Sequence, residues 1–303
     1  WRCLIGGRNV TPGMRLTSPS SSLTVTVIER TGSEAAVELA WSEDASLSEM
    51  IAAEGRIPLP PYLGREAEEA DHERYQTVYA EDEGSVAAPT AGLHFTDRVF
   101  DALAARGVER ANVTLHVGLG TFHPVSAQDA RDHVMHGERY GITRTALESL
   151  LRHATSNDPW TTAVGTTSLR TLESIFAVGA RALQSGAPGE VTTDVGQWEA
   201  FDRSLDTFSR ADAVRGLLAI LDARSTDALW GETNLMLAPG CRIAMADALI
   251  TNFHQPGNTL LLLVAAFVGD AWQTIYDTAL REGYRFLSYG DSSLLVRTPR
   301  VTT

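Results

Sequence analysis

The histidines are the residues of this chain with the clearest capacity for chemistry. Six of the eight lie in short segments rich in Gly, Thr, Pro and Asn, namely His94, His116, His123, His133, His136 and His254. Histidine exchanges protons near neutral pH, and glycine allows a backbone to approach a ligand closely. Because the two residue types recur together, we predict one catalytic pocket that is assembled from several loops.

The segment Ala163–Arg170 has the pattern of an anion site. A short strand is followed by Gly165, Thr166, Thr167 and Ser168 and then by a helix, which places unpaired N–H groups and hydroxyls at a helix N-terminus. Arg170 and Glu173 are three positions apart and therefore share a helix face. An ordinary helix cap with a surface ion pair would explain the same residues, so both interpretations stay open.

Two further segments offer ligand-facing groups. His133, His136 and Glu138 have the types and spacing of metal ligands if they lie on a helix, but Met135 and Gly137 do not resemble a rigid metal cage. We therefore expect no metal there. Proton transfer and substrate contact are the alternative roles for these residues. His116 ends a predicted strand beside Gly118 and Gly120, where α/β folds place ligand-facing groups. A buried, hydrogen-bonded histidine is the alternative.

Two C-terminal segments complete the set. Asp247–His254 runs from a predicted strand into a polar turn, and Asn252 and His254 are expected to leave the sheet on the same side. Tyr284–Asp291 combines aromatic faces, an arginine and a carboxylate around a glycine. Such a set can stack a nucleobase and hold a ribose or an amine. An edge strand with ordinary packing is the alternative for this last segment.

Two domains are needed to position these motifs. Residues 1–56 predict a β-rich domain, since Leu23–Glu29 alternates apolar and polar side chains. Residues 57–303 alternate helical and strand patterns, which predicts an α/β domain. The prolines from Pro58 to Pro61 mark the boundary. Residues 183–232 have a different composition and predict an insertion with one helix around 210–223.

Composition excludes several classes of function. All 25 basic residues are arginine, so a lysine Schiff base, a lysine general base and a P-loop lysine are excluded. The net charge of −13 gives no overall attraction to nucleic acid or to an anionic membrane.

Two distant cysteines, Cys3 and Cys241, favour a reducing cytoplasm. The apolar run Leu260–Val268 is too short for a bilayer and predicts a buried helix or strand. The chain opens at Trp1 in what resembles mid-domain sequence, so we expect a preceding segment.

Together these segments resemble the S-adenosylmethionine:tRNA ribosyltransferase-isomerase family of the queuosine pathway. The matching stretches follow the family's order and are specific as a set: Leu59–Tyr62, Tyr75–Tyr79, Ala87–Phe95, Thr114–Val125, His133–Glu138, Val164–Ser168 with Arg170 and Leu172–Ser174, Asp247–His254 and Tyr284–Asp291.

The resemblance implies both a reaction and a fold. S-adenosylmethionine is the co-substrate, and its ribosyl moiety is transferred and isomerised onto the 7-aminomethyl-7-deazaguanine base at the tRNA wobble position. Epoxyqueuosine forms, while adenine and methionine leave. The fold implied is an α/β main domain with an inserted β-barrel-like domain, only partly present at the N-terminus here. The partner is tRNA, and we expect a cytoplasmic monomer without membrane contact.

The resemblance also implies roles for the catalytic residues. A base must remove the proton on the ribose carbon beside the sulfonium, and His116 or His136 is the candidate, with Glu138 orienting or relaying. An acid must assist the departure of adenine, and His94 or Asp247 is the candidate.

Substrate contacts are expected from the remaining motif residues. Arg170 and the Gly165–Ser168 turn are expected to hold the methionine carboxylate or a tRNA phosphate, and Phe286 and Tyr289 to stack a base. The full set of expected contacts is Thr90, Gly92, Gly118, Gly120, Thr121, His133, Gly165, Thr166, Thr167, Ser168, Arg170, Glu173, Asn252, His254, Phe286, Tyr289 and Asp291.

Some features leave alternatives open. Asn258 stands where the family usually has Ser, the 183–232 segment is longer than the common version, and the acidic charge is ill suited to tRNA phosphates. A divergent paralogue with the same donor and another acceptor remains an alternative. A metal-dependent hydrolase that uses His133 and His136 is the second.

Overall fold

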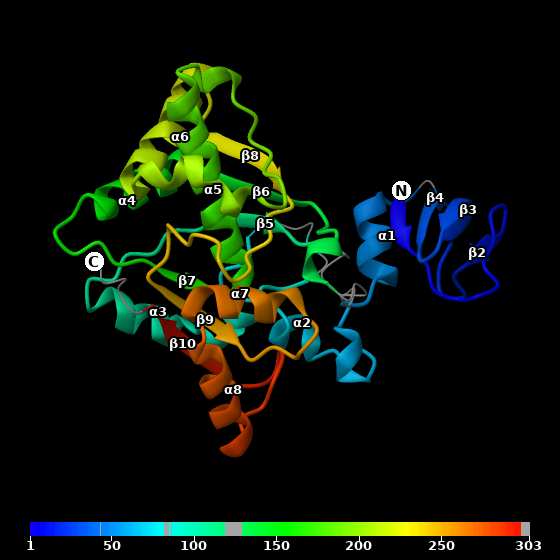
Figure 1. Cartoon of the computed structure of the whole chain (residues 1–303). Helices are drawn as coiled ribbons and strands as arrows, with labels where there is room; N and C mark the ends of the chain where they lie inside the picture. The colour runs from blue at the N-terminus through cyan, green and yellow to red at the C-terminus, as the bar shows by residue number, and fades with distance from the viewer. Residues whose placement is uncertain (43, 82–84, 86, 119–128, 298–303) are drawn as a thin grey trace. The chain divides into compact units, whose positions relative to one another are not determined.

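The chain divides into two compact units (Figure 1). The computed structural model describes residues 1–42, 44–81, 85, 87–118 and 129–297. Contacts along the chain separate Trp1–Glu69 from Ala70–Thr303. The sequence places the boundary after residue 56, at the proline-rich segment, whereas the contacts place it after Glu69.

The first unit is an open antiparallel sheet. Its strands are β1 (Arg2–Leu4), β2 (Arg15–Thr17), β3 (Thr24–Thr31) and β4 (Glu34–Ala40), in the order β1-β4-β3-β2. Val27, Ala35 and Val37 form its buried centre. The β3–β4 pairing shifts register after Val27, so Ile28 becomes an extra residue and is 51% exposed. This bulge interrupts the alternation that the sequence predicts through Glu29. Among the described strands, β1 and β2 do not pair with each other, so these residues form no closed barrel.

One helix follows this sheet. Helix α1 (Leu47–Glu54) begins at Ser46, whose hydroxyl accepts the Glu49 N–H, while the Glu49 carboxylate accepts the Ser46 N–H. This reciprocal capping satisfies two backbone donors at the start of the helix. Gly55 ends α1, and the short 3₁₀ helix η1 (Pro61–Leu63) comes next.

The second unit contains two small sheets. The antiparallel sheet has the order β5-β6-β8, with β5 (Thr114–His116), β6 (Glu138–Thr143) and β8 (Ala228–Thr233). The other has β9 (Ala248–Asn252) between β10 (Ser292–Val296) and β7 (Thr162–Val164). Strand β9 is antiparallel to β10 and parallel to β7, which makes β7–β9 the only parallel pair among the described strands. The unit is thus a mixture of helices and small sheets.

Helices surround these sheets. They are α2 (Asp71–Arg74), α3 (Asp97–Ala104), α4 (Arg144–Ala154), α5 (Thr166–Ser185), α6 (Arg210–Arg224), α7 (Thr259–Val268) and α8 (Ala271–Arg281), with the 3₁₀ helices η2 (Thr90–His94), η4 (Ala130–Asp132), η5 (Pro188–Glu190), η6 (Glu199–Phe201) and η7 (Arg203–Thr207). Figure 1 shows α4, α5 and α6 beside β6 and β8, and α7 and α8 beside β9 and β10. No single described helix is long and apolar enough to cross a bilayer. Helices α7 and α8 pass that test only jointly, across a bend of 117°.

Helices α5 and α6 cross at two glycines. A Cβ on Gly179 of α5 would overlap the carbonyl oxygen of Ala213 in α6, and a Cβ on Gly216 of α6 would overlap the carbonyl oxygen of Gly179. The two backbones therefore touch, which lets Leu217 and Ile220 of α6 bury completely. The predicted helix around 210–223 is confirmed, and it belongs to the main core of this unit.

We predict that Gly179→Ala forces the helices apart. Overpacking a well-packed interface costs about 1–3 kcal/mol, so the free energy of unfolding in urea should fall by that amount. Gly196→Ala is the control, because the nearest atom to its Cβ would be 4.0 Å away. Equal stability of the two variants would contradict the close crossing.

Candidate active site

The candidate site lies where the parallel strands β7 and β9 end. Gly165 follows β7 with a φ of 93°, donates its N–H to the carbonyl of Ile250 in β9 over 2.8 Å and precedes the first residue of α5. Asn252 is the last residue of β9. Because the carboxyl ends of neighbouring parallel strands open at the same edge, the N-terminus of α5 and Asn252 lie at one edge of this sheet.

Helix η2 brings His94 and Thr90 to Asn252. The buried Asn252 side chain joins both, since its Oδ1 is 3.0 Å from His94 Nε2 and its Nδ2 donates to Thr90 Oγ1 over 3.0 Å. With the amide in this orientation, His94 carries a proton on Nε2 and leaves Nδ1 as the second nitrogen for chemistry. The structure thus brings three of the expected site residues together.

Gly92 allows η2 to pack in this position. A Cβ on Gly92 would overlap the hydroxyl of Tyr79 and lie 2.8 Å from Thr77 Cγ2. The Tyr75–Tyr79 stretch therefore supports η2 directly. Burial raises the pKa of the Tyr79 hydroxyl, which keeps this contact uncharged.

A small pocket opens at the N-terminus of α5. Its polar lining is Thr166, Thr167 and Arg170 of α5 with Thr259 of α7, and its apolar lining is Met135, Leu235, Met236, Leu237, Leu260 and Leu263. No described side chain caps the N-terminus of α5. Its first-turn N–H groups therefore remain donors for an anion. This is the geometry that the sequence predicts for Gly165–Ser168.

Arg170 makes a buried ion pair, with a partner that differs from expectation. Its guanidinium pairs with the Glu138 carboxylate of β6, and the two side chains are only 11% and 5% exposed. Burial lowers the pKa of Arg170 to about 10. The interpretation as a surface ion pair is therefore wrong, because the charge of Arg170 is buried and its partner comes from a strand.

The loop from Tyr284 to Asp291 places a carboxylate near His94. Leu287 adopts a φ of 70°, uncommon for a side-chain-bearing residue, and donates its N–H to the Phe253 carbonyl over 2.9 Å. Asp291 accepts the N–H of Arg285 at 2.7 Å and its guanidinium at 3.2 Å. These bonds, and to a smaller extent the charge of His94, lower the pKa of Asp291. Asp291 therefore lies within electrostatic reach of His94.

Phe286 and Tyr289, the two aromatic residues of this loop that are expected to stack a base, are already engaged. Phe286 packs on Phe253 and Tyr276 with ring centroids 5.4 and 5.9 Å apart. Tyr289 is 36% exposed, and its hydroxyl donates to Asp71 Oδ1 over 3.0 Å. The expectation that Phe286 stacks a base conflicts with its place against the core.

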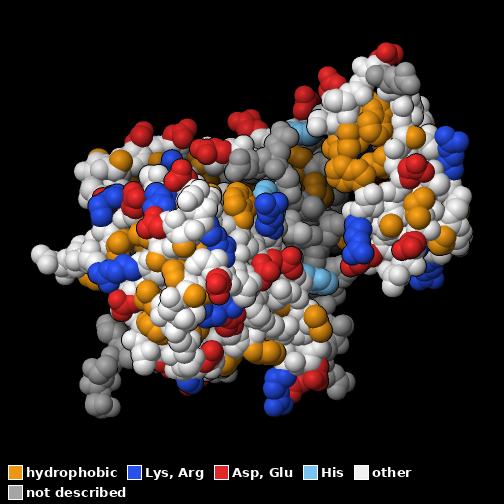
Figure 2. Space-filling view, turned by 90° about the horizontal axis from the view of Figure 1, so that it is seen from above, with side chains coloured by type: hydrophobic (Ala, Val, Ile, Leu, Met, Phe, Trp, Pro, Cys, Tyr) orange, Lys and Arg blue, Asp and Glu red, His pale blue; other side chains and the backbone are white. Residues whose placement is uncertain are grey.

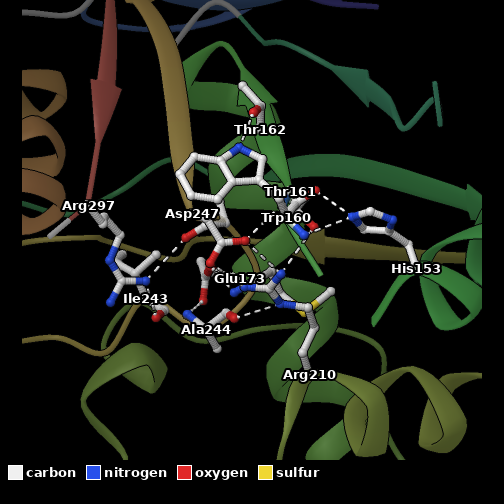
Figure 3. Close-up of polar contacts among 12 residues, drawn as sticks. His153, Trp160, Thr161, Thr162, Glu173, Arg210, Ile243, Ala244, Asp247 and Arg297 are labelled. Carbon is white, nitrogen blue, oxygen red and sulfur yellow. Dashed lines mark hydrogen bonds and ion pairs between the residues drawn. The ribbon is translucent and has the colours of Figure 1, made fainter. Parts of the chain in front are cut away.

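Asp247 lies in a polar cluster with Arg210 and Thr161 (Figure 3). It precedes the first residue of β9, whereas Asn252, which holds His94, is the last, roughly 16 Å away at the usual rise of a strand. Arg210 donates to both of its carboxylate oxygens, at 2.9 and 3.1 Å, and the Thr161 N–H donates at 2.8 Å. Burial alone would raise the pKa of Asp247, but these bonds outweigh it and the pKa is lowered. The Asp247 carboxylate is thus ionised, bound by Arg210 and distant from His94, and these contacts do not favour its expected role as an acid.

Glu173 belongs to the same polar cluster in Figure 3. It is buried and accepts the N–H groups of Ala244 and Met245 at 2.7 and 2.8 Å. Burial raises its pKa to about 7, against the opposing effect of these hydrogen bonds. Glu173 thus ties α5 to the loop before β9, and it is not placed for the expected substrate contact.

His116 faces away from Glu138. His116 is the register partner of Arg139, and side chains alternate along β6, so His116 and Glu138 lie on opposite faces of the sheet. The His116 ring stacks instead on Trp230, with ring centroids 6.0 Å apart. The expected orientation of His116 by Glu138 is therefore not formed.

His133 and His136 do not share a helix face. The chain from His133 to Gly137 is irregular and leads directly into β6. The His133 carbonyl accepts Gln197 Nε2 at 2.6 Å, and the His136 side chain is exposed. Within the described ranges, no three His, Cys, Asp or Glu side chains are grouped as a metal site would require.

His254 is buried just after the end of β9. Its ring Nε2 lies 2.9 Å from Thr251 Oγ1, and its backbone N–H donates to the Tyr276 hydroxyl over 3.0 Å. Strand β9 ends at Asn252, so the alternation that would align Asn252 with His254 does not continue. The expected contacts Gly120 and Thr121, like His123, lie outside the described residues. Gly118 is the last residue described before them.

Sequence reasoning missed some residues of this region. Thr259 lines the pocket because Asn258 caps α7 by accepting the Leu260 N–H at 2.9 Å. An Asn before an apolar run is a helix-start signal that could have identified it. Trp230 and Arg139, beside His116, carry no sequence signal, since only strand pairing brings them together.

Comparison with known proteins gives consistent matches. Residues 1–295 match the model of a family described as queuosine biosynthesis protein. A protein of Azoarcus sp. (strain BH72), named S-adenosylmethionine:tRNA ribosyltransferase-isomerase, is 40% identical over 92% of this chain and 67% of its own length. A protein of the same name from Acidithiobacillus ferrooxidans is 40% identical over 97% of this chain and 72% of its own length.

A solved structure also aligns with the chain. It is S-adenosylmethionine tRNA ribosyltransferase from Thermotoga maritima, with 22% identity and a TM-score of 0.43 over 96% of this chain and 68% of that chain. The family assignment rests on the sequence matches.

Two buried groups give the chain opposing pH dependences. Burial lowers the pKa of His254 from 6.5 to about 4 and raises that of Glu173 from 4.5 to about 7. Between pH 4 and 6.5 the unfolded state binds more protons at His254, so stability rises with pH. Between pH 4.5 and 7 the folded state holds more protons at Glu173, so stability falls with pH. Each effect amounts to about 3 kcal/mol, and the two nearly cancel.

We predict that removing either group reveals the other. In Glu173→Gln the free energy of unfolding should rise more steeply than in the wild-type chain between pH 4.5 and 6.5. In His254→Gln it should fall relative to the wild-type chain over the same range. Urea unfolding at several pH values measures both, and a slope unchanged from wild type in either variant would contradict the assigned shift.

Proposed function

The chain belongs to the queuosine biosynthesis protein family, and we propose that it transfers and isomerises the ribosyl moiety of S-adenosylmethionine onto a base of tRNA. The proposed acceptor is 7-aminomethyl-7-deazaguanine at the wobble position, and the products are epoxyqueuosine, adenine and methionine. The observation that carries this proposal is the family match across residues 1–295.

The pocket at the N-terminus of α5 suits the methionine portion of the donor. A carboxylate there would accept N–H groups from Thr166 and Thr167 and meet the positive end of the helix dipole. Met135, Met236 and the leucines of the pocket offer an apolar wall for the methylene groups. Glu138 compensates the buried charge of Arg170, which holds the guanidinium in the wall of the pocket.

His94 is the proposed acid for the departure of adenine. A protonated His94 would keep Nε2–H on Asn252 and donate from Nδ1. Asn252 acts as a positioning residue, because its second hydrogen bond, to Thr90, fixes the amide that holds the ring.

His136 is the proposed base. It must take the proton from the ribose carbon beside the sulfonium, whose positive charge stabilises the resulting carbanion. His136 adjoins Met135, which lines the pocket, whereas His116 faces the opposite side of the sheet from Glu138. The His136 side chain is exposed, and imidazole is the side chain that most often serves as a general base.

The sheet of Trp1–Glu69 is proposed to be part of a barrel-like domain. Four antiparallel strands with a bulge in β3 support this assignment, since bulges bend a sheet toward closure. In the described residues the sheet remains open.

Adenine release tests the proposed activity. The chain is incubated with S-adenosylmethionine and with tRNA that carries the deazaguanine precursor, and free adenine is measured. We expect adenine only when both substrates are present. Release that depends on a different RNA acceptor would favour a paralogue, and release without any RNA would contradict the transfer.

We predict that His94→Gln lowers kcat for adenine release by roughly 10²- to 10⁴-fold, the usual contribution of a general acid. Asn252→Ala should lower kcat less and shift its pH profile, because it removes the support of His94 and leaves the imidazole. His72→Gln is the control, since His72 is an exposed histidine of α2. Normal turnover in His94→Gln would reject His94 as the acid.

A further inference from the structure

The outward face of the β5-β6-β8 sheet carries an aromatic platform formed by Trp230, His116 and Arg139. Trp230 of β8 is 39% exposed. The His116 ring lies nearly parallel to the indole, at 17° and with centroids 6.0 Å apart. The Arg139 guanidinium carbon is 4.9 Å from the centre of the Trp230 ring. The indole of Trp230 is therefore partly exposed to a ligand, with the His116 imidazole and the Arg139 guanidinium beside it.

Strand pairing builds this platform. Gly141 of β6 is the register partner of Trp230, and a Cβ on Gly141 would lie 2.6 Å from the indole ring. Only glycine lets the indole lie against the strand at this position. His116 is the register partner of Arg139 in the same way, so all three side chains share the face opposite Glu138 and Tyr140.

Within the described part of the chain, the Arg139 guanidinium has no ion-pair partner and the Trp230 N–H has no hydrogen-bond acceptor. Arg139 forms no ion pair there, although Glu232 is its register partner on β8. The Trp230 N–H donates no hydrogen bond to a described residue. In contrast, Trp41 and Trp160 both donate theirs, to Ala45 and Thr162. Donors, charge and an aromatic face are thus left for an external ligand.

We propose that the platform binds an unpaired nucleobase of the RNA substrate, with Trp230 stacking on the base and Arg139 contacting the adjoining phosphate. This inference rests on the proposed function, which requires RNA. Bases in single-stranded loops splay out and stack on aromatic side chains, and arginine adds charge attraction. Stacking on Trp also requires no specific base edge, so the platform would tolerate different loop sequences.

The overall charge makes such a local contact necessary. The chain has a net charge of −13, and the face in Figure 2 shows arginine and acidic side chains intermixed rather than a continuous basic patch. Stacking does not depend on net charge, so it can supply affinity where phosphate contacts are few. Arg139 adjoins Glu138 on β6, and Glu138 pairs with Arg170 of the proposed donor pocket. The platform therefore lies on the opposite face of the sheet from that pocket, and it would bind a base other than the acceptor.

Trp230→Leu and Trp230→Phe test the proposal. Leu keeps an apolar side chain over Gly141 but removes the aromatic face, whereas Phe keeps that face. Binding of a labelled anticodon stem-loop RNA is measured by fluorescence anisotropy at one fixed salt concentration. We expect Trp230→Leu to weaken binding roughly 5- to 150-fold and Trp230→Phe to retain most of the affinity. Arg139→Gln should weaken binding and lower the slope of log affinity against log salt by about one.

Trp198→Leu is the matched control, because Trp198 is 42% exposed and also packs on an aromatic ring, that of Phe201. Its RNA affinity should equal that of the wild-type chain, and S-adenosylmethionine binding should be unchanged in every variant. Wild-type RNA affinity in Trp230→Leu, or an equal loss in Trp198→Leu, would overturn the platform. A parallel loss of S-adenosylmethionine binding in Trp230→Leu would overturn it as well.

The same series separates this inference from the proposed function. If wild-type chain binds the RNA through Trp230 but releases no adenine with tRNA, the platform stands and the transferase activity fails. If the wild-type chain releases adenine and Trp230→Leu keeps the wild-type KM for tRNA, the activity stands and the platform is overturned.

Discussion

The parallel pairing of β7 with β9 is the constraint on which the candidate site depends. The N–H of Gly165 donates to the Ile250 carbonyl, and this single bond aligns the end of β7 with the end of β9. Helix α5 therefore begins beside Asn252, which in turn holds His94 and Thr90. Neither an anion pocket nor an oriented imidazole would form at this edge if the two strands were displaced by one residue, because side-chain direction alternates along each strand.

Buried charge is the second requirement of this architecture. Arg170 and Glu138 are both removed from water, and each is tolerated only because the other is present. Glu173 is buried with two N–H donors and pairs with no cation among the described residues, and its raised pKa is the consequence of its burial. Arg170 and Glu173 lie on α5 and join it to β6 and to the loop before β9. The helix is thereby held at a fixed position relative to the proposed donor pocket, which favours precise placement of a ligand.

Most secondary structure followed from local patterns, and the exceptions have physical causes. The helix α6 and the buried helix α7 agree with the sequence expectations. The alternation around Ile28 failed, because pairing with β4 inserted a bulge that no local pattern encodes. His133 and His136 have the spacing of metal ligands on a helix, but their segment is irregular and leads into β6. A spacing of three has meaning for ligands only when the backbone conformation is already known.

The sequence by itself determined the family, the mixed α and β character of the chain and the anion-binding pattern at Gly165–Ser168. These depend on local order along the chain, because a glycine turn before a helix presents its N–H groups in any context. Tertiary structure alone decided which side chains meet. It paired Arg170 with Glu138 rather than with Glu173. It also placed Asp247 at the far end of β9, bonded to Arg210, and stacked the His116 ring on Trp230. Partners separated by many residues are selected by strand register and helix crossing, and neither is written in the spacing of the residues themselves.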